Sequence, residues 1–285
     1  MNAALGDREF GLLRDLIKMH SGIALNECKR PLLQARLAKR LRQLGLQSYR
    51  EYYDYLVQHD PGAQERDRFI NALTTNTTAF FREPHHFDYL VHQWLPTLRA
   101  RMLRGGAPTL RIWSSACSTG EEAYSLAITL TEALQPLPRW DIHVLASDID
   151  TEALATGRAG VYPAASIDPV PEPLRQRYFQ TGTGASTGLV RVVPRIQQLV
   201  TFTRINLLSA AWPVLSRFDC IFCRNVIIYF DAPTKQQVLN RLATALQRDG
   251  LLVLGHSESL LGRGLRFHHL GHTIYQANDP HRCTT

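Results

Sequence analysis

The spacing of hydrophobic residues divides the chain into two parts. In the first 75 residues, apolar positions recur every three or four residues, which places them on one face of a helix. Two such faces are Leu12, Leu13, Leu16 and Ile17, and Leu33, Leu37, Leu41 and Leu44. No strand-like alternation interrupts them, so we expect residues 1–75 to form an all-helical domain.

From Thr109 onward, strand patterns alternate with helix patterns. The expected strands cover 109–116, 141–150, 199–208, 218–228 and 251–257, and the expected helices cover 121–134, 151–158 and 232–250. Such alternation predicts a parallel sheet with helices on both faces. The pattern over 266–278 is expected to supply an antiparallel last strand. The sequence thus predicts an α/β domain over 109–285, preceded by an interdomain segment and helix over 76–108.

Residues 160–197 do not follow this alternation. The stretch is rich in Pro and Gly, contains the run TGTGASTG, and has one short strand-like piece, GLVRVV. An irregular region of this length between two strands is usually an insertion with a small structure of its own. We therefore expect an inserted β-subdomain here.

The composition is that of a globular chain, with 45% hydrophobic and 20% charged residues. No apolar run approaches the roughly 20 residues that span a bilayer. The N-terminus also lacks a basic region followed by an apolar core. We expect a cytoplasmic protein without membrane insertion.

Five cysteines, an odd number, are scattered along the chain, which argues against a secreted disulfide framework. Cys220 and Cys223 form a C-x-x-C pattern, which also occurs in redox and zinc sites. They lie in the strand-like run FDCIFCRNVIIYF, and no second pair supplies further zinc ligands. We interpret them as packed core residues and expect no bound metal.

The net charge of +7 predicts an acidic partner, and charge alone leaves nucleic acid, a membrane surface and an acidic protein open. Between Cys28 and Arg50 every charged residue is basic: Lys29, Arg30, Arg36, Lys39, Arg40, Arg42 and Arg50. Two interpretations of this basic face remain open. It is either the solvated surface of a small helical bundle or a docking face for an acidic partner.

Candidate ligand-binding residues follow the first two expected strands. The first strand ends in SSACSTGEEAYS, where small residues lead into a helix whose free N–H groups can face a ligand. The phosphate-binding patterns G-x-G-x-x-G and G-x-x-x-x-G-K-[ST] are both missing from the sequence. Glu121 and Glu122 favour a cationic ligand over a phosphate, unless they are ordinary acids of a first helical turn.

The second strand ends at Asp148, which is placed to accept hydrogen bonds from ribose hydroxyls. Alternatively, an acid in this position caps the helix that begins at Thr151. A ribose-binding acid beside a loop that disfavours phosphate indicates a nucleoside with positive charge. S-adenosylmethionine fits that description.

Several segments resemble the CheR-type chemotaxis receptor methyltransferases, which esterify glutamate side chains on receptor cytoplasmic domains. In the family's order they are NALTTNTTAFFRE, RIWSSACSTGEEAYSLAI, ASDIDTEAL, the segment around INLL, FDCIFCRNVIIYFD and DGLLVLGHSES. They cover nearly the whole chain, and NTTAFFRE and CRNVIIYFD are long enough to be specific. The resemblance implies an α/β, Rossmann-like S-adenosylmethionine-dependent methyltransferase sheet with an antiparallel last strand. It also implies an N-terminal all-helical domain and a small inserted β-subdomain.

The resemblance further implies the residues of the site. Cofactor contacts are expected from Asn76, Thr78, Arg82, Glu122, Asp148, Asn206, Leu207, Arg224 and Asn225. The catalytic candidates are Arg82 and Tyr229, which the resemblance places beside the transferred methyl group. From the residues alone, Arg82 would be an ion-pair partner of Glu83, Glu121 or Glu122, and Tyr229 a packing residue.

The activity that the resemblance implies is methyl esterification of specific glutamates on methyl-accepting chemotaxis receptors, with S-adenosylhomocysteine as the product. A glutamate has an ordinary pKa of about 4.3, so at neutral pH it is already a carboxylate nucleophile and needs no strong base. We therefore expect no catalytic role for His85 or His86. Arg82 is expected to orient a carboxylate, of either the substrate or the cofactor, and Tyr229 to hydrogen-bond an oxygen at the transfer point.

The resemblance also implies the partners. In the family, the helical domain contributes to recognition of the receptor's methylation helices, and the β-subdomain can bind a C-terminal receptor tether. We expect a monomer recruited to receptor arrays, with no nucleic acid partner. Within NTTAFFRE, Phe80 and Phe81 are expected to anchor the junction between the helical domain and the sheet.

Two other functions remain as alternatives: a methyltransferase that acts on nucleic acid, and a non-catalytic module that binds S-adenosylmethionine. Against the first, the sequence has no zinc module and no aromatic-and-basic platform. It also carries CRNVIIYFD where a base-amino methyltransferase has an acidic-aromatic tetrapeptide. Against the second, both Arg82 and Tyr229 are present.

Overall fold

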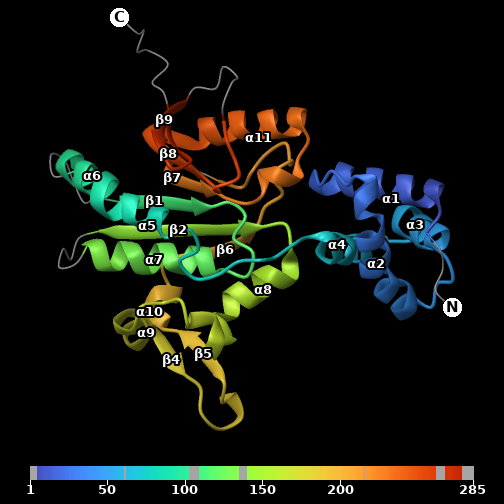
Figure 1. Ribbon diagram of the computed structural model, residues 1–285, viewed down its shortest axis with the longest axis horizontal. Helices are drawn as coiled ribbons and strands as arrows, with labels where there is room; N and C mark the ends of the chain where they lie inside the picture. Colours follow the sequence, from blue (N-terminus) through green and yellow to red (C-terminus); the bar gives the residue numbers. More distant parts are fainter. Residues whose placement is uncertain are drawn as a thin grey trace, which may run out of the picture.

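The computed structural model describes residues 5–60, 62–102, 109–134, 140–214, 216–260 and 267–277. Cys283 and the limits predicted at residues 108, 266 and 278 lie outside these ranges. Figure 1 shows three parts: a group of N-terminal helices, a sheet flanked by helices, and a smaller sheet below it. Among the described helices, none combines the length and apolar character that a membrane crossing requires.

The predicted all-helical fold of the N-terminal part is confirmed. It contains α1 (Asp7–Ser21), α2 (Arg30–Leu44), α3 (Tyr49–Gln58) and α4 (Gln64–Leu73), with a 3-10 turn at Glu27–Lys29. α1 and α2 end at glycines with left-handed backbone, the conformation that glycine adopts most readily. The apolar faces meet in one core that includes Phe10, Leu13, Ile17, Leu33, Leu37, Tyr52 and Phe69. Burial of these side chains holds the helices together.

A junction connects these helices to the sheet. Residues 74–79 have no regular secondary structure. They lead to α5 (His85–Tyr89), a π-helical stretch (Leu90–Trp94) and α6 (Leu95–Met102). The junction therefore crosses from one part of the molecule to the other as open chain, and its side chains are available for contacts on both sides.

The predicted mixed sheet with an antiparallel last strand is confirmed. Its strands are β1 (Thr109–Ser114), β2 (Asp141–Asp148), β6 (Val200–Arg204), β7 (Phe218–Cys223), β8 (Leu246–Leu254), β9 (Phe267–Gly271) and β10 (Ile274–Ala277). The order is β6-β2-β1-β7-β8-β10-β9. The strands from β6 to β8 pair in parallel, whereas β10 is antiparallel to β8 and β9. A hairpin, β9 and β10, replaces the single strand expected over 266–278.

The helix expected over 232–250, with a strand only from 251, is wrong at its end. α11 covers Ala232–Ala245, and β8 begins directly at Leu246. Leu246 pairs with Phe218 of β7 across a register shift and is buried in the same core. Pairing with a strand distant in sequence thus overrides the local helical pattern of residues 246–250.

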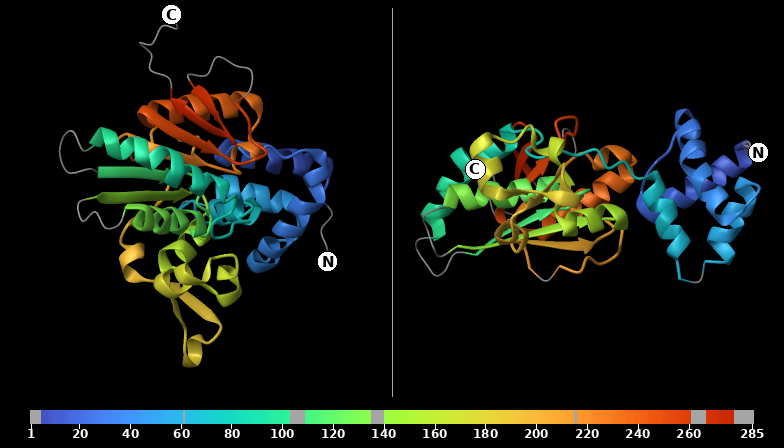
Figure 2. Two further views of the ribbon diagram at one scale, coloured as in Figure 1. Left: turned by 60° about the vertical axis from the view of Figure 1, so that its left-hand side comes forward. Right: turned by 90° about the horizontal axis from the view of Figure 1, so that it is seen from below.

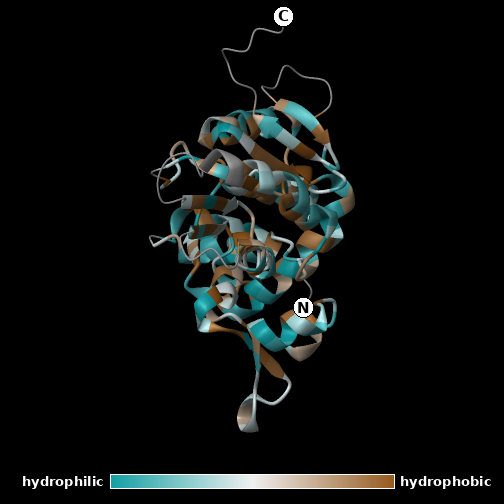
Figure 3. Ribbon diagram, turned by 90° about the vertical axis from the view of Figure 1, so that its left-hand side faces the viewer, coloured by the Kyte–Doolittle hydropathy of each residue, from teal (hydrophilic) through white to brown (hydrophobic). Residues whose placement is uncertain are grey.

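Successive strand residues point to opposite faces of the sheet, and each face has its own core. Ile112 packs in the core beneath α7 (Glu121–Leu134), while its neighbour Trp113 packs in the core beneath α11. Figure 3 shows hydrophobic residues along the strands between the helical layers. The sheet is therefore covered on both faces, as predicted.

Cys220 and Cys223 are both fully buried, but they belong to the cores on opposite faces of β7. Burial raises the pKa of both thiols. Two neutral thiols on opposite faces of one strand cannot bind one ion together, which agrees with their interpretation as packing residues.

The predicted β-subdomain is confirmed between α8 (Thr151–Ala159) and β6. Its sheet has the antiparallel order β3 (Val161–Pro163), β5 (Leu189–Val192), β4 (Phe179–Thr181). It also contains α9 (Glu172–Tyr178), α10 (Pro194–Gln197) and 3-10 turns at Ala164–Ile167 and Gly184–Ser186.

The helical part packs against the edge of the sheet where the parallel strands end (Figure 2). The Ala24 N–H donates to the Tyr229 carbonyl at 2.9 Å. The Asn206 side-chain amide donates to the His20 carbonyl at 2.6 Å. Because these bonds join the end of α1 to the loops after β6 and β7, they close one side of the space above the strand ends.

Candidate active site

One pocket lies where the junction and the carboxyl ends of the strands meet. All ten predicted site residues line it: Asn76, Thr78, Arg82, Glu122, Asp148, Asn206, Leu207, Arg224, Asn225 and Tyr229. The strand order of the sheet reverses direction here, since β1 pairs with β2 on one side and with β7 on the other. Such a reversal of strand order is where open α/β sheets bind ligands.

The loop after β1 holds Asp148 in place. The Ser118 N–H donates to Asp148 Oδ2 at 2.8 Å, and the Asp150 N–H donates to Oδ1 at 3.0 Å. Burial raises the pKa of Asp148, and these backbone donors oppose the shift. Each oxygen keeps a further acceptor position, so Asp148 can accept hydrogen bonds from ligand hydroxyls.

The second acid of this segment, Asp150, performs the capping role that was the alternative for Asp148. Asp150 Oδ1 accepts the N–H groups of Glu152 and Ala153 at the start of α8. Its Oδ2 accepts bonds from Thr74 Oγ1 at 2.6 Å and from Asn76 Nδ2 at 2.7 Å. Asp150 therefore joins the junction to the sheet.

Two predicted cofactor residues are engaged with the protein itself. The Asn76 amide nitrogen binds Asp150, and the Asn206 amide nitrogen binds the His20 carbonyl. Asn206 Oδ1 also accepts the Leu208 N–H at 2.9 Å. Both side chains hold the pocket wall, as does the buried Leu207, whose carbonyl accepts a bond from Arg241. Any direct contact of these residues with a cofactor remains a prediction.

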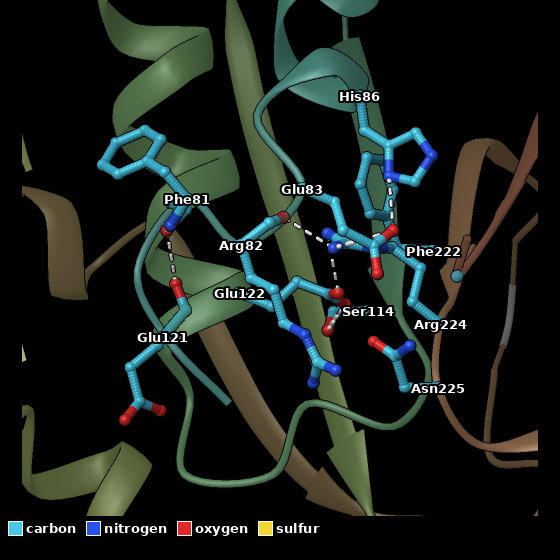
Figure 4. A network of polar contacts seen from close by, with 12 residues as sticks. Phe81, Arg82, Glu83, His86, Ser114, Glu121, Glu122, Phe222, Arg224 and Asn225 are labelled. Carbon is cyan, nitrogen blue, oxygen red and sulfur yellow. Dashed lines mark hydrogen bonds and ion pairs between the residues drawn. The ribbon is translucent and has the colours of Figure 1, made fainter. Parts of the chain in front are cut away.

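Arg224 is the centre of a buried ionic network (Figure 4). Its side chain is 1% exposed and lies 3.3 Å from Glu122 Oε2 and 3.4 Å from Glu83 Oε2. It also donates to the Arg82 carbonyl at 2.6 Å. Ser114 Oγ donates to Glu122 Oε1 at 2.6 Å. Burial raises the pKa of Glu122, and Arg224 counters that shift.

Glu121 and Glu122, adjacent in sequence, are separated by the structure. Glu122 faces the pocket, whereas Glu121 points away from it (Figure 4) and accepts a bond from Thr119 Oγ1 at 2.6 Å. Burial raises the pKa of Glu121. Neighbouring residues of a helix point about 100° apart, so only one of the two can line the site.

Glu83 joins the junction to the loop after β8. It accepts the His256 N–H at 3.1 Å, and its Oε1 lies 3.0 Å from His256 Nδ1. Burial raises the pKa of Glu83, but the bonds from His256 and the charge of Arg224 outweigh it and lower that pKa overall.

His86 is fully buried, and its Nε2–H donates to the His272 carbonyl at 2.9 Å. Ligand atoms of Glu83, His85 and His86 lie within 4.8 Å of one another, close enough to consider a metal. Arg224 already supplies Glu83 with a positive charge, which disfavours a metal ion at this position.

Arg82 and Tyr229 differ from Arg224 in having few bonds to the protein. The Arg82 guanidinium donates to the Thr77 carbonyl at 2.8 Å, while Glu83 and Glu122 bind Arg224 instead. Tyr229 is half-buried on the pocket wall, and in the described part of the chain no hydrogen bond engages its hydroxyl. Both side chains thus line the pocket with donors available for a ligand. Thr78 lines the same space.

The two phenylalanines of the junction anchor it differently from the prediction. Phe80 is 1% exposed and makes edge contacts with Tyr162 and Phe179 of the β-subdomain. Phe81 is partly buried against Phe87, and its N–H donates to Ser125 Oγ. Anchoring to the sheet is confirmed, because Phe80 lies in the core on the α7 face of the sheet and Phe81 packs against that core. Their aromatic partners lie in the β-subdomain and α5 and not in the helical domain.

Sequence reasoning missed Glu258, in the loop after β8. Its side chain accepts backbone N–H groups from the loop that carries Arg224 and Asn225. The segment DGLLVLGHSES, which contains Glu258, was part of the resemblance, but nothing local indicates which residue in it has a buried partner. Only the approach of β8 to β7 brings these groups together.

The fold and the pocket first define a class. The sheet of parallel strands with one antiparallel strand near its edge, and the acid at the end of its second strand, are the features that the resemblance implied for an S-adenosylmethionine-dependent methyltransferase. Residues 76–276 match the family described as "CheR methyltransferase, SAM binding domain", and residues 8–74 match "CheR methyltransferase, all-alpha domain". The chain belongs to the CheR methyltransferase family.

Curated relatives match over nearly their whole length. The chain is 46% identical over 267 residues to chemotaxis protein methyltransferase 2 of Pseudomonas aeruginosa, covering 94% of this chain and 92% of the relative. It is 45% identical over 273 residues to the chemotaxis protein methyltransferase of Salmonella typhimurium, covering 95% and 91%. The corresponding protein of Escherichia coli is 44% identical over 273 residues, covering 95% and 91%.

Proposed function

We propose that this protein is a protein-glutamate O-methyltransferase, which uses S-adenosylmethionine to esterify glutamates on the cytoplasmic helices of methyl-accepting chemotaxis receptors. One observation carries the proposal. At one pocket, a buried arginine satisfies the two acids beside it, and a second arginine, Arg82, remains available with Tyr229. A site with a free arginine and a free tyrosyl hydroxyl suits a carboxylate substrate. The names of the curated relatives support a role in chemotaxis.

The residues of the pocket fit the cofactor. Asp148 offers acceptors for ribose hydroxyls, and the acids around the pocket favour a cation over a phosphate. We assign the cofactor contacts to Asn76, Thr78, Arg82, Glu122, Asp148, Asn206, Leu207, Arg224 and Asn225. When bound, S-adenosylmethionine supplies an electrophilic methyl group. The proposal includes no metal.

The chemistry asks the protein mainly for positioning. The substrate glutamate is a carboxylate at neutral pH, so no residue has to remove a proton. Arg82 pairs with a carboxylate, and the Tyr229 hydroxyl donates to an oxygen at the transfer point. Correct alignment of two reactants can lower a barrier by roughly 7–11 kcal/mol at most, which makes alignment the main catalytic contribution. His86 is buried, and its Nε2–H is bound to a carbonyl, so it takes no part.

The helical domain is proposed to dock the receptor, but the structure changes which cations are available. Arg40 is paired with the buried Glu65 at 2.6 Å, Arg30 with Asp7 and Glu27, and Arg50 with Asp54. Part of the predicted basic face therefore forms ion pairs within the helical domain and is not available to a partner. Lys39 and Arg42 of α2 are exposed and, among the described residues, form no ion pair. We assign them to docking.

The β-subdomain is the proposed site for a C-terminal receptor tether. In the small sheet, β3 and β4 are the outer strands, so each has one edge without a partner strand in the described part. An extended peptide can add to such an edge through main-chain hydrogen bonds. We further propose a cytoplasmic monomer that is recruited to receptor arrays and has no nucleic acid partner.

The decisive experiment uses S-adenosylmethionine labelled in its methyl group and a receptor cytoplasmic fragment. We expect label on glutamate in a base-labile ester. Label on nucleic acid would support the first alternative activity, and cofactor binding without transfer to any acceptor would support a non-catalytic module. Failure to bind S-adenosylhomocysteine would refute the whole proposal.

Arg82→Ala tests the site itself. We expect its rate at saturating cofactor to fall about 100-fold, because a donor to a reacting carboxylate is lost. If Arg82 orients the substrate, the affinity for S-adenosylhomocysteine stays unchanged; if it orients the cofactor, that affinity falls as well. Arg158→Ala, an exposed arginine of α8 that does not line the pocket, is the matched control and should keep the full rate.

A further inference from the structure

A turn after β8 contacts both the loop after β7 and the junction, and each of these segments supplies residues to the pocket. Its residue Glu258 is 3% exposed, although it is a charged side chain. Its two carboxylate oxygens accept four backbone N–H groups: Gly255 at 2.7 Å, Asn225 at 2.8 Å, Val226 at 3.0 Å and Ile228 at 3.3 Å. A buried carboxylate with several N–H donors is strongly held, and each donor is satisfied by it.

Three of these donors belong to the loop between Arg224 and Tyr229. This loop leaves β7 at Cys223, so its N–H groups have no strand ladder to join. Asn225 has φ +57°, in the left-handed region, which asparagine adopts more readily than most residues other than glycine. The bond from its N–H to Glu258 stabilises that conformation. Without Glu258, the loop would lose acceptors for three N–H groups at once.

The close contact between the turn and the loop also depends on Gly255. A Cβ at position 255 would lie 2.5 Å from Asn225 Nδ2 and 3.0 Å from the Asn225 backbone nitrogen. Only glycine allows the turn to approach the loop so closely. The turn also reaches the junction, because the His256 N–H and Nδ1 bind Glu83, the residue after Arg82.

We infer that Glu258 is a positioning residue: it fixes the loop that carries Tyr229 and, through the same turn, sets this loop relative to the Arg82–Glu83 wall. The inference rests on the proposed function, since the role of Tyr229 belongs to that proposal. Glu258 does not line the pocket. It acts on the reaction through the backbone of residues 225–228, which leads directly to Tyr229.

The first test measures the loop without any reaction. Glu258→Gln keeps the shape of the side chain but replaces one acceptor oxygen with an amide that faces N–H donors. We expect amide hydrogen exchange at residues 225, 226 and 228 to accelerate at least tenfold. Asp60→Asn is the matched control: Asp60 also accepts two backbone N–H groups, of Glu65 and Arg66, and it does not line the pocket. Unchanged exchange at 225–228 in Glu258→Gln would overturn the inference.

The second test asks whether Glu258 acts through Tyr229. Glu258→Gln is expected to lower the methyl-transfer rate at saturating substrates at least tenfold in the wild-type background. In a Tyr229→Phe background the same substitution should cost less than threefold, because the group that it positions is already lost. Equal losses in both backgrounds would overturn the inference. Asp60→Asn should keep the full rate.

Glu258→Asp provides a rescue arm and a safeguard if Glu258→Gln does not fold. It keeps the charge on a side chain one methylene shorter, so we expect intermediate exchange at residues 225–228 and an intermediate rate. Exchange as slow as in the wild type together with a full rate would show that the position of the carboxylate does not matter. The exchange measurements are independent of methyl transfer. A wild-type protein that fails to methylate receptor would therefore refute the proposed function, and the exchange result would still decide whether Glu258 fixes the loop.

Discussion

The two ends of the pocket hold their acids in different ways. At the end formed by β2, Asp148 is held by two backbone N–H groups, and no ion pair to it is found among the described residues. At the end formed by β7, Glu83 and Glu122 share the buried guanidinium of Arg224. Both ends bury carboxylates, but only the second neutralises them with a cation.

This difference suits two kinds of ligand group. A carboxylate held by backbone donors keeps free lone pairs, so it can accept bonds from neutral hydroxyls. Arg224 pairs with the neighbouring acids, and within the described ranges no ion pair engages the guanidinium of Arg82, which we propose binds a carboxylate of the ligand. We therefore propose that the β2 end binds hydroxyl groups of the ligand and that the β7 end binds a carboxylate.

The largest expected effect comes from removing the ion pairs at the β7 end. Arg224→Ala leaves Glu83 and Glu122 buried without their cation and should lower the free energy of unfolding by about 3–5 kcal/mol. Arg82→Ala is the control, since in the described part of the chain Arg82 donates to a carbonyl and forms no ion pair; it should cost less than about 1 kcal/mol. Urea unfolding of both variants measures the difference. Similar losses of unfolding free energy in both variants would show that Arg224 does not neutralise the buried acids as the structure indicates.

The second effect concerns pH at the same end. Burial lowers the pKa of His86 to about 4, below the ordinary value of 6.5. Between these pH values the unfolded chain takes up a proton and the folded chain does not, so stability falls as the pH falls through this window. The loss reaches about 3 kcal/mol at most.

His86→Gln retains a donor for the His272 carbonyl but does not titrate. Unfolding by urea at several pH values between 6.5 and 4 should therefore show a flatter profile for this variant than for the wild type. His92→Gln, at an exposed position of the π-helical stretch, should retain the wild-type slope. If His86→Gln had the same slope as the wild type, a group other than His86 would cause the pH dependence of stability.

The third effect tests the β2 end. Asp148→Asn removes the charge that strengthens hydrogen bonds to hydroxyls and should weaken binding of S-adenosylhomocysteine by about 1.5–3 kcal/mol, or roughly 10- to 100-fold. Isothermal titration calorimetry measures this directly. Affinity within threefold of the wild type would remove Asp148 from the binding site and with it the contrast between the two ends.

The smallest expected effect concerns α2, which lies outside both ends of the pocket. Substitutions there should change receptor methylation and leave both ends of the pocket intact. Lys39→Glu with Arg42→Glu should lower receptor methylation at limiting receptor by about 1 kcal/mol, or fivefold, and less at high salt. The affinity for S-adenosylhomocysteine should not change. Arg40→Glu would be a poor test of docking, because it places a second acid against the buried Glu65 and is expected to unfold the domain.

Much of the fold was predictable because its signals are local. Leu33, Leu37 and Leu41 repeat with the helical period. The strands predicted over 109–116 and 141–150 are present as Thr109–Ser114 and Asp141–Asp148, each two residues shorter at its end. The end of α11 was not predictable in this way. Leu246 continues a helical pattern, but it pairs with Phe218, a residue distant in the sequence.

The site shows the same division. Its residues follow strand ends and fill a specific junction segment, so their positions in one pocket could be expected from the sequence and the resemblance. Their bonding could not. Arg82 and Arg224 look alike in sequence, yet among the described residues Arg224 pairs with two acids, whereas Arg82 donates to a carbonyl.

The sequence by itself therefore determined the kinds of element, the order of the parts and the residues at the strand ends, because periodicity and turn chemistry act over a few residues. Only the tertiary structure decided which acid faces the pocket, which arginine remains free and what holds the loop after β7. Those outcomes depend on groups far apart in the chain, such as Glu258 and Asn225, that meet only when neighbouring strands pair. Their bonding is set by burial, which makes every charge and N–H group require a partner.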